Sequence, residues 1–325
     1  NCYFHEGFCN LKGQSRAKSA IYLADEIRAD KFTLDVGVRW ERALGLISRE
    51  TGIGTNSFER GEVSASDFAV VLAGLYRLNN QINLYANASR GYFFPELRGV
   101  RFLTPGTPQS YETEKINQAE IGVKYGSKKL SATVAGFFVG LNDRRNIDFV
   151  NDGQGGVIEE VFTQSTQTLG VEGTATYQIV SGLSVNTQLT YQEHQFTKVE
   201  GNTDLEGNRL RRQPLFKGSL GLNYNQNRID FNASVLYLGQ RYANDANTVR
   251  LDPYSLVRLG AGYTFDLDKQ GGKLRLGVSV FNLLDSEGIT EGSPRQGNTQ
   301  VGTASFFVGR PILPRRVALR ALFEF

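Results

Sequence analysis

Apolar and polar residues alternate along most of this chain, in stretches of about ten residues or more. From Phe32 to Glu41, alternate positions carry Phe, Leu, Val, Val and Trp, while the positions between them carry Thr, Asp, Gly, Arg and Glu. The stretch from Ile229 to Tyr237 has the same form. Because successive side chains of a β-strand point to opposite faces, each stretch predicts a strand with one apolar face and one polar face.

The pattern predicts thirteen strands, which short turns and long loops join in strict alternation. The strands lie at about 14–28, 31–45, 65–78, 81–90, 114–126, 128–144, 162–178, 182–197, 213–226, 228–241, 254–267, 272–285 and 316–325. The polar loops lie at about 45–64, 90–112, 145–160, 198–212, 242–253 and 286–315. Short turns at one end and long loops at the other are typical of an outer-membrane β-barrel.

Composition narrows the possible classes of protein but does not decide between them. The chain is 40% hydrophobic and 21% charged, as a soluble protein can be, but a barrel strand also presents only half its residues to lipid. A soluble β-sandwich is the alternative, yet its strands usually have about five or six residues, far fewer than those predicted here. The net charge of +3, with no basic run interleaved with aromatic residues, argues against nucleic acid as a partner.

Six segments, in order along the chain, resemble those of one family. Two of them are the penultimate-strand sequence Val280-Phe281-Asn282-Leu283-Leu284-Asp285 and the alternating strand that ends at Phe325. The full set is 19–27, 32–41, 84–97, 114–125, 280–285 and 317–325. Together they resemble the C-terminal barrel portion of a TonB-dependent outer-membrane receptor.

This resemblance implies an all-β fold, a transmembrane antiparallel up-and-down β-barrel. Transporters of this kind have about 22 strands around a plugged lumen, so thirteen strands form an incomplete part and leave about nine unaccounted for. The odd count agrees, because bacterial single-chain barrels have even counts. We therefore expect residues 1–325 to be the C-terminal part of the barrel, with the plug domain and the N-terminal strands absent.

The resemblance also implies a function, the energised uptake of a scarce extracellular ligand. A ferric siderophore is the first expectation for that ligand. Uptake of carbohydrate or another nutrient remains open, and a passive porin or structural barrel is a further alternative. The loop at 92–97 has no histidine nearby of the kind that haem receptors of the family carry. We expect no enzyme, no cofactor and no resident metal, since the chain has only two histidines, His5 and His194.

Arginine and aromatic side chains in the long loops are the candidate ligand-binding residues, because many ferric siderophores are anionic and carry planar groups. The candidates are Arg90, Tyr92, Arg98, Arg101, Arg144, Arg145, Arg241, Tyr242 and Arg295. Cys2 and Cys9 are expected to form a disulfide, since the protein would pass through an oxidising periplasm. A metal site that includes His5 would have too few ligands.

The resemblance further implies partners and an orientation. The partners are the TonB complex, through the missing N-terminal plug region, a small-molecule ligand, and outer-membrane lipid and lipopolysaccharide. The terminal Phe325 resembles the signal that the barrel-assembly machinery reads. The last strand descends from the loop at 286–315, so we expect extracellular long loops, with the short turns and the C-terminus in the periplasm.

Overall fold

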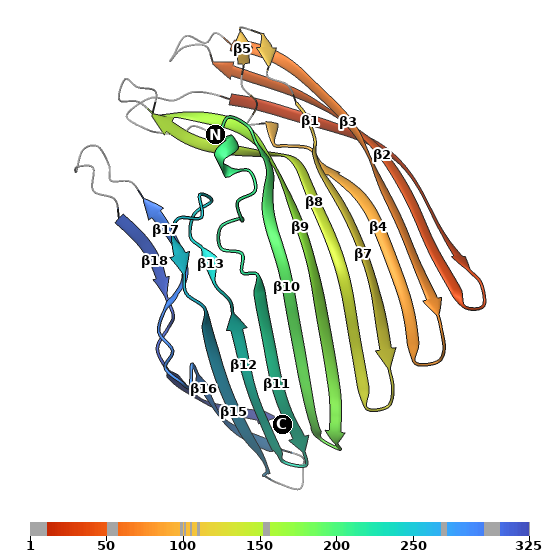
Figure 1. Ribbon diagram of the computed structural model, residues 1–325, viewed down its shortest axis with the longest axis vertical. Helices are drawn as coiled ribbons and strands as arrows, with labels where there is room; N and C mark the ends of the chain where they lie inside the picture. The colour runs from red at the N-terminus through yellow and green to blue at the C-terminus, as the bar shows by residue number, and fades with distance from the viewer. Residues whose placement is uncertain are drawn as a thin grey trace.

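A single sheet of thirteen antiparallel strands dominates the computed structural model, and each strand pairs with its neighbours in chain order (Figure 1). The described residues are 12–50, 58–97, 100, 102–104, 106–108, 111–151, 157–267, 272–295 and 306–324. The sheet strands are β1 (Lys12–Arg28), β2 (Phe32–Glu50), β3 (Phe58–Arg77), β4 (Ile82–Phe93), β7 (Glu114–Gly126), β8 (Leu130–Asn151), β9 (Val157–Val180), β10 (Leu183–Val199), β11 (Phe216–Gln226), β12 (Ile229–Leu238), β15 (Tyr254–Asp266), β16 (Lys273–Phe281) and β19 (Arg316–Glu324).

In the part of the chain that the structure describes, three small hairpins and the 3-10 turn η2 lie outside this sheet. The hairpins pair β5 (Phe102–Thr104) with β6 (Thr107–Pro108), β13 (Arg241–Tyr242) with β14 (Arg250–Leu251), and β17 (Ile289–Arg295) with β18 (Phe306–Pro311); η2 spans Thr203–Leu205. Within the described ranges, no helix has the length and apolarity to cross a membrane. The all-β, up-and-down antiparallel prediction and its thirteen strands are confirmed.

Two predicted loops are largely strand in the structure. The sequence predicts loops at 45–64 and 145–160, whereas β2 continues to Glu50, β3 begins at Phe58, β8 continues to Asn151 and β9 begins at Val157. Pairing of β2 with β3 continues through Leu46 and Glu62 to the ends of both strands. Cross-strand hydrogen bonds therefore hold polar segments that local composition assigns to loops.

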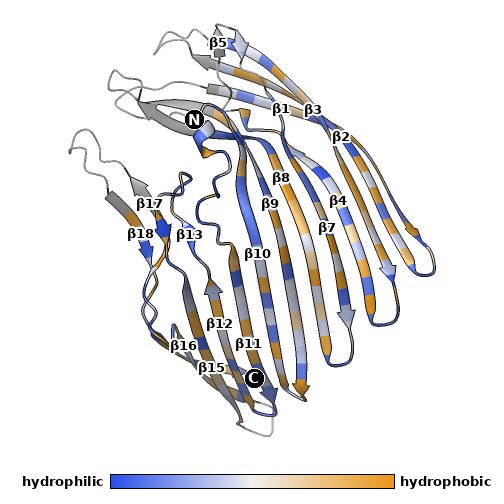
Figure 2. Ribbon diagram, viewed as in Figure 1, coloured by the Kyte–Doolittle hydropathy of each residue, from blue (hydrophilic) through white to orange (hydrophobic). Residues whose placement is uncertain are grey.

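The register places apolar residues opposite apolar residues from strand to strand. Val235 of β12, for example, pairs with Leu220 of β11 and with Val257 of β15. Figure 2 shows the resulting alternation of hydrophobic and hydrophilic positions along the strands. Ile121 and Leu169 on this apolar face are 69% and 66% exposed, which is more than a protein in water tolerates over a whole sheet. We conclude that this face contacts lipid.

The opposite, polar face carries charged and amide side chains that bond to one another across strands. Arg275 donates to both carboxylate oxygens of Asp230 at 2.9 and 2.5 Å, and Asn223 donates to Asn186 at 2.8 Å. Among the described residues, β1 pairs only with β2 and β19 only with β16, so the sheet has two open edges.

The short turns are closed by side chains suited to them. The Oδ1 atom of Asn79 accepts the N–H groups of Gln81 and Ile82 at 2.8 and 2.9 Å. Gly182 has a φ of +78°, and a Cβ there would lie 2.7 Å from the carbonyl oxygen of Asn225. Glycine is therefore required in that turn by both backbone conformation and space.

Candidate functional site

The long-loop end of the polar face holds a carboxylate with several donors around it. Glu41 of β2 is only 5% exposed, and its Oε1 lies 3.2 Å from the Nζ of Lys18 on β1. Arg39 donates to Oε2 at 3.0 and 2.7 Å, and the hydroxyl of Tyr92 on β4 donates to it at 3.1 Å. Three strands thus bring two cations and a phenol to one buried carboxylate.

Beside this cluster, Phe94, Leu97, Val100 and Tyr111 pack over the polar face of β2 and β3. Phe94 packs its ring edge-on against Tyr92, with centroids 5.2 Å apart, and the Nζ of Lys18 lies 5.1 Å from the Phe94 centroid. The apolar core of this contact consists of Ala43, Ile47, Val63, Phe94, Leu97, Val100 and Tyr111. It is the main buried hydrophobic cluster among the described residues.

Two hydrogen bonds also tie Pro95 to its surroundings. The hydroxyl of Tyr111 and the Nη2 of Arg16 both donate to the carbonyl oxygen of Pro95, each at 2.6 Å. Burial raises the pKa of the Tyr111 hydroxyl, so it stays protonated and able to donate at neutral pH. The described residues Phe94, Pro95, Leu97, Val100 and Tyr111 therefore cover part of the polar face.

An ion pair connects β3 and β4 beyond the point where their backbone pairing ends. The last backbone pair is Val70 with Arg90, and beyond it the Nη2 of Arg90 lies 2.6 Å from Oδ1 of Asp67, a side chain that is 6% exposed. The Arg90 guanidinium also stacks on the Phe68 ring at 4.0 Å, and Thr113 donates to Oδ2 of Asp67. Side chains thus close the wall here in place of backbone hydrogen bonds.

Two of the long loops are joined by the side chain of Asn247. Its Oδ1 accepts the backbone N–H of Arg209 at 2.9 Å, and its Nδ2 donates to the Arg209 carbonyl at 2.7 Å. The Nδ2 of Asn208 also donates to the carbonyl of Asp245 at 3.1 Å. The loop after β10 and the loop after β12 are therefore one hydrogen-bonded unit.

We expect Asn247→Ala to separate these two loops. Asn247 has a φ of 56°, so alanine would lose both hydrogen bonds and also strain the backbone, whereas Asn247→Gly would lose only the hydrogen bonds. Hydrogen-exchange mass spectrometry should show faster exchange of residues 203–211 in both variants. Wild-type exchange in Asn247→Gly would contradict the assigned role of the side chain.

Arg241 links the same unit to the next loop. It is 2% exposed and donates to the carbonyl oxygens of Ile289 and Thr290 at 2.6 Å each, and to that of Asp252 at 3.2 Å. Burial lowers the pKa of Arg241, although the guanidinium remains charged at physiological pH. Its contacts hold three loop segments together.

The structure places the sequence-predicted ligand residues in different settings. Arg90, Tyr92 and Arg241 make the internal contacts described above, and the carbonyl of Tyr242 accepts the N–H of Arg212 at 2.6 Å. Arg144 is exposed at a register shift in β8, and the N–H of the half-buried Arg145 donates to Glu114 at 3.2 Å. Arg295 ends β17, and its side chain is not described. Arg98, Arg101, Cys2, Cys9 and Phe325 lie outside the described residues.

Sequence reasoning missed Lys18, Arg39 and Glu41. The alternation places Arg39 and Glu41 on the polar face of one strand, but nothing local indicates that Lys18 and Tyr92 meet them there. His194 of β10 lies with its Nδ1 2.6 Å from the hydroxyl of Thr168 on β9. Among the described residues, no group of three or more His, Cys, Asp or Glu side chains could hold a metal ion.

Comparison with known proteins agrees with this architecture. Residues 7–283 match the family model described as TonB dependent receptor-like, beta-barrel. The chain belongs to the TonB-dependent receptor β-barrel family. This family consists of receptors and transporters of the bacterial outer membrane.

Among its relatives is the ferrioxamine receptor of Yersinia enterocolitica, which is 28% identical over 279 residues. That match covers 83% of this chain and 36% of the relative. The solved structures include the ferric yersiniabactin uptake receptor FyuA from Yersinia pestis, with a TM-score of 0.73, 17% identity, and coverage of 97% of this chain and 47% of FyuA. The ferric preacinetobactin receptor BauA from Acinetobacter baumannii has a TM-score of 0.70 and 17% identity, and the match covers 97% of this chain and 44% of BauA. The chain spans less than half the length of each, and the structural likeness shows the fold alone.

Proposed function

We propose that the complete TonB-dependent receptor of which this chain forms a part takes up a ferric siderophore across the outer membrane. The observation that carries the proposal is the similarity to a ferrioxamine receptor over 83% of the chain. The family match favours an energised receptor over the porin alternative. In this account TonB acts through a plug domain, and residues 1–325 supply wall and ligand-binding loops.

Arg39 and Lys18 are the ligand-binding residues that we propose first, together with Arg144. The side chains of Arg39 and Lys18 are 47% and 46% exposed, although both contact Glu41. A guanidinium has five N–H donors and an ammonium has three, so each retains donors for the oxygen atoms of a ferric siderophore. Glu41 and Tyr92 would position these cations, and Phe94 would limit the space beside them.

The proposal predicts selective, high-affinity uptake. Cells that express the complete reading frame, and lack their other iron receptors, should accumulate iron from one ferric siderophore of a panel that includes ferrioxamine. Arg39→Gln should weaken binding of that siderophore by about tenfold, because a charge-assisted hydrogen bond is lost. Arg228→Gln, at the short-turn end of the sheet, is the control and should bind as the wild type does. Accumulation of an oligosaccharide in place of iron would favour the carbohydrate alternative and overturn the proposal.

Orientation can be tested separately from uptake. We propose that the long loops face outward and the short turns face the periplasm, as the contrast in their lengths suggests. An epitope tag inserted between Asn202 and Thr203 should bind antibody on intact cells, whereas a tag between Ser127 and Lys128 should bind it only after permeabilisation. The opposite result would reverse the orientation. Lipopolysaccharide at the outer rim and the barrel-assembly machinery at the terminal strand are further proposed partners.

A further inference from the structure

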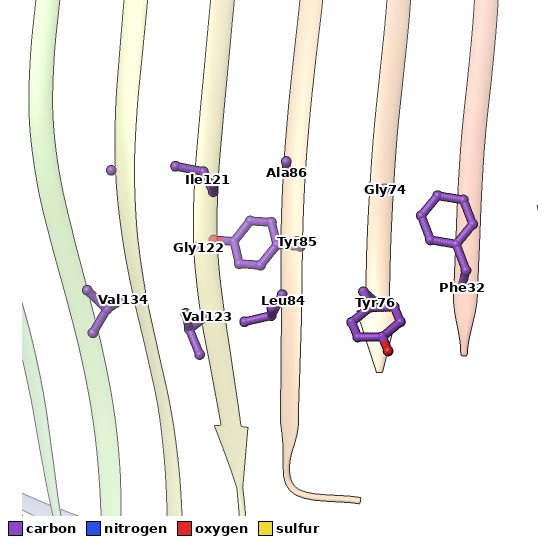
Figure 3. A pocket seen from close by; sticks show the side chains of 11 residues that line it. Phe32, Gly74, Tyr76, Leu84, Tyr85, Ala86, Ile121, Gly122, Val123 and Val134 are labelled. Carbon is purple, nitrogen blue, oxygen red and sulfur yellow. The ribbon is translucent and has the colours of Figure 1, made fainter. Parts of the chain in front are cut away.

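A shallow groove crosses the apolar face near the short-turn end of the sheet (Figure 3). Its volume is about 550 Å³, and it runs across β2, β3, β4, β7 and β8. Small residues form its floor, namely Gly74, Ala86 and Gly136, and larger side chains such as Phe32, Tyr76 and Ile121 stand around them. The groove therefore opens toward lipid and away from the polar face.

The groove exists because small residues stand where larger side chains would otherwise fill the space. The packing of the sheet does not require these residues to be small. Gly74 pairs with Ala86, Ala86 with Ile121, and Ile121 with Gly136, so the small residues lie at one level on three strands, with Ile121 of β7 between Ala86 and Gly136. A Cβ on Gly74 would contact the Phe32 ring at an ordinary 3.7 Å, and one on Gly136 would come no closer than 4.0 Å to another atom. Larger residues would fit at both glycines, so the space is available to a ligand.

Positive charge gathers at the end of the groove that lies next to the turns. Lys31, Arg77, Lys128 and Lys129 are exposed at the ends of the same five strands. Asp30 is the only acidic residue in the segments 28–31, 77–81 and 127–129. None of the four basic side chains forms an ion pair with a described carboxylate, unlike Arg228 at a more distant turn, which pairs with Asp266. The groove thus ends at a cationic rim.

We propose that this groove is a binding site for an anionic glycerophospholipid, with one acyl chain in the groove and the phosphate at the basic rim. The acyl chain gains close dispersion contacts that a smooth sheet face would not give. The lysines supply the preference for an anionic headgroup, since each basic residue at a membrane surface attracts such lipids. The choice of a glycerophospholipid rests on one part of the proposed function, the orientation of the barrel. In that orientation the short turns, and with them the groove, lie at the periplasmic leaflet.

Native mass spectrometry of the complete receptor, purified in detergent and mixed with equal amounts of phosphatidylglycerol and phosphatidylethanolamine, tests the site. The wild type should retain one phosphatidylglycerol in preference. Changing Lys31, Lys128 and Lys129 to Gln together should lower that preference by about tenfold or more. The control Lys273→Gln removes a basic residue at another turn and should retain the preference.

Gly74→Leu should fill the groove and abolish lipid retention while the sheet still folds, because a Cβ is accommodated there. Ala261→Leu, an exposed position on the apolar face of β15, is the matched control and should retain lipid. Wild-type retention by Gly74→Leu, an unchanged preference in the triple lysine variant, or retention of lipid A in place of glycerophospholipid would overturn the proposal. Loss of siderophore uptake with these lipid results intact would count against the proposed function alone.

Discussion

Val235→Arg should make insertion of the complete receptor into lipid vesicles less favourable by about 2–4 kcal/mol, if the residue lies near the bilayer midplane. Val235 lies in the middle part of β12, on the apolar face, between Leu220 and Val257 of the neighbouring strands. An arginine there would place its charge among hydrocarbon chains. A urea titration of folding in vesicles measures the change in free energy.

The control for this variant is Asn232→Arg on the polar face of the same strand. Asn232 pairs with the uncharged residues Asn223 and Gly260. The nearer polar-face position, Ser234, is less suitable because an arginine there would lie opposite Arg258 and be repelled by it. We expect Asn232→Arg to cost far less than Val235→Arg. Equal costs at the two positions would show that the faces of the sheet are assigned wrongly.

Asp67→Ala should destabilise the receptor by about 2–3 kcal/mol, because it leaves the Arg90 guanidinium without its carboxylate partner. The Asp67 side chain is 6% exposed and that of Arg90 is 22% exposed, so water replaces the lost contact poorly. Thr113 would lose its acceptor as well. The urea midpoint should fall, and residues 111–116 should exchange their amide hydrogens faster.

A second ion pair provides the comparison for Asp67→Ala. Arg209 and Glu193 lie 3.4 Å apart with side chains that are 39% and 42% exposed. Glu193→Ala should therefore cost less than about 1 kcal/mol, as exposed pairs usually do. If both variants lowered stability equally, burial would not be what makes the Asp67 pair important.

The strands of the sheet can be predicted from the sequence because the alternation of apolar and polar residues that marks them is a local pattern. Residues 114–126 are predicted as a strand and form β7 within the same limits, since the alternation from Ala119 to Tyr125 is followed directly by the turn at Ser127. Strand ends beyond the membrane carry no such signal. The far part of β2, up to Glu50, is held by pairing with β3 and by the buried cluster in which Phe94 and Leu97 pack with Ile47. Both causes lie outside any sequence window.

The roles of the charged residues depend on contacts that are distant in sequence. The sequence predicts Arg241 as a ligand-binding residue, and the structure adds that it donates to carbonyl oxygens of Ile289 and Thr290, 48 and 49 residues away. Glu41 meets Tyr92 across 51 residues in the same way. Composition and alternation identify the end of the sheet at which the long loops lie. They do not distinguish the arginines that hold loops together from those that remain accessible.

Uptake of the preferred ferric siderophore, measured with and without TonB, shows whether the receptor is energised. Cells that carry the complete reading frame should take up radioactive iron to saturation. When TonB is inactivated, uptake should fall to the level of cells without the receptor, while surface binding of the siderophore persists. Uptake that continues unchanged without TonB would contradict the account and indicate a passive pore.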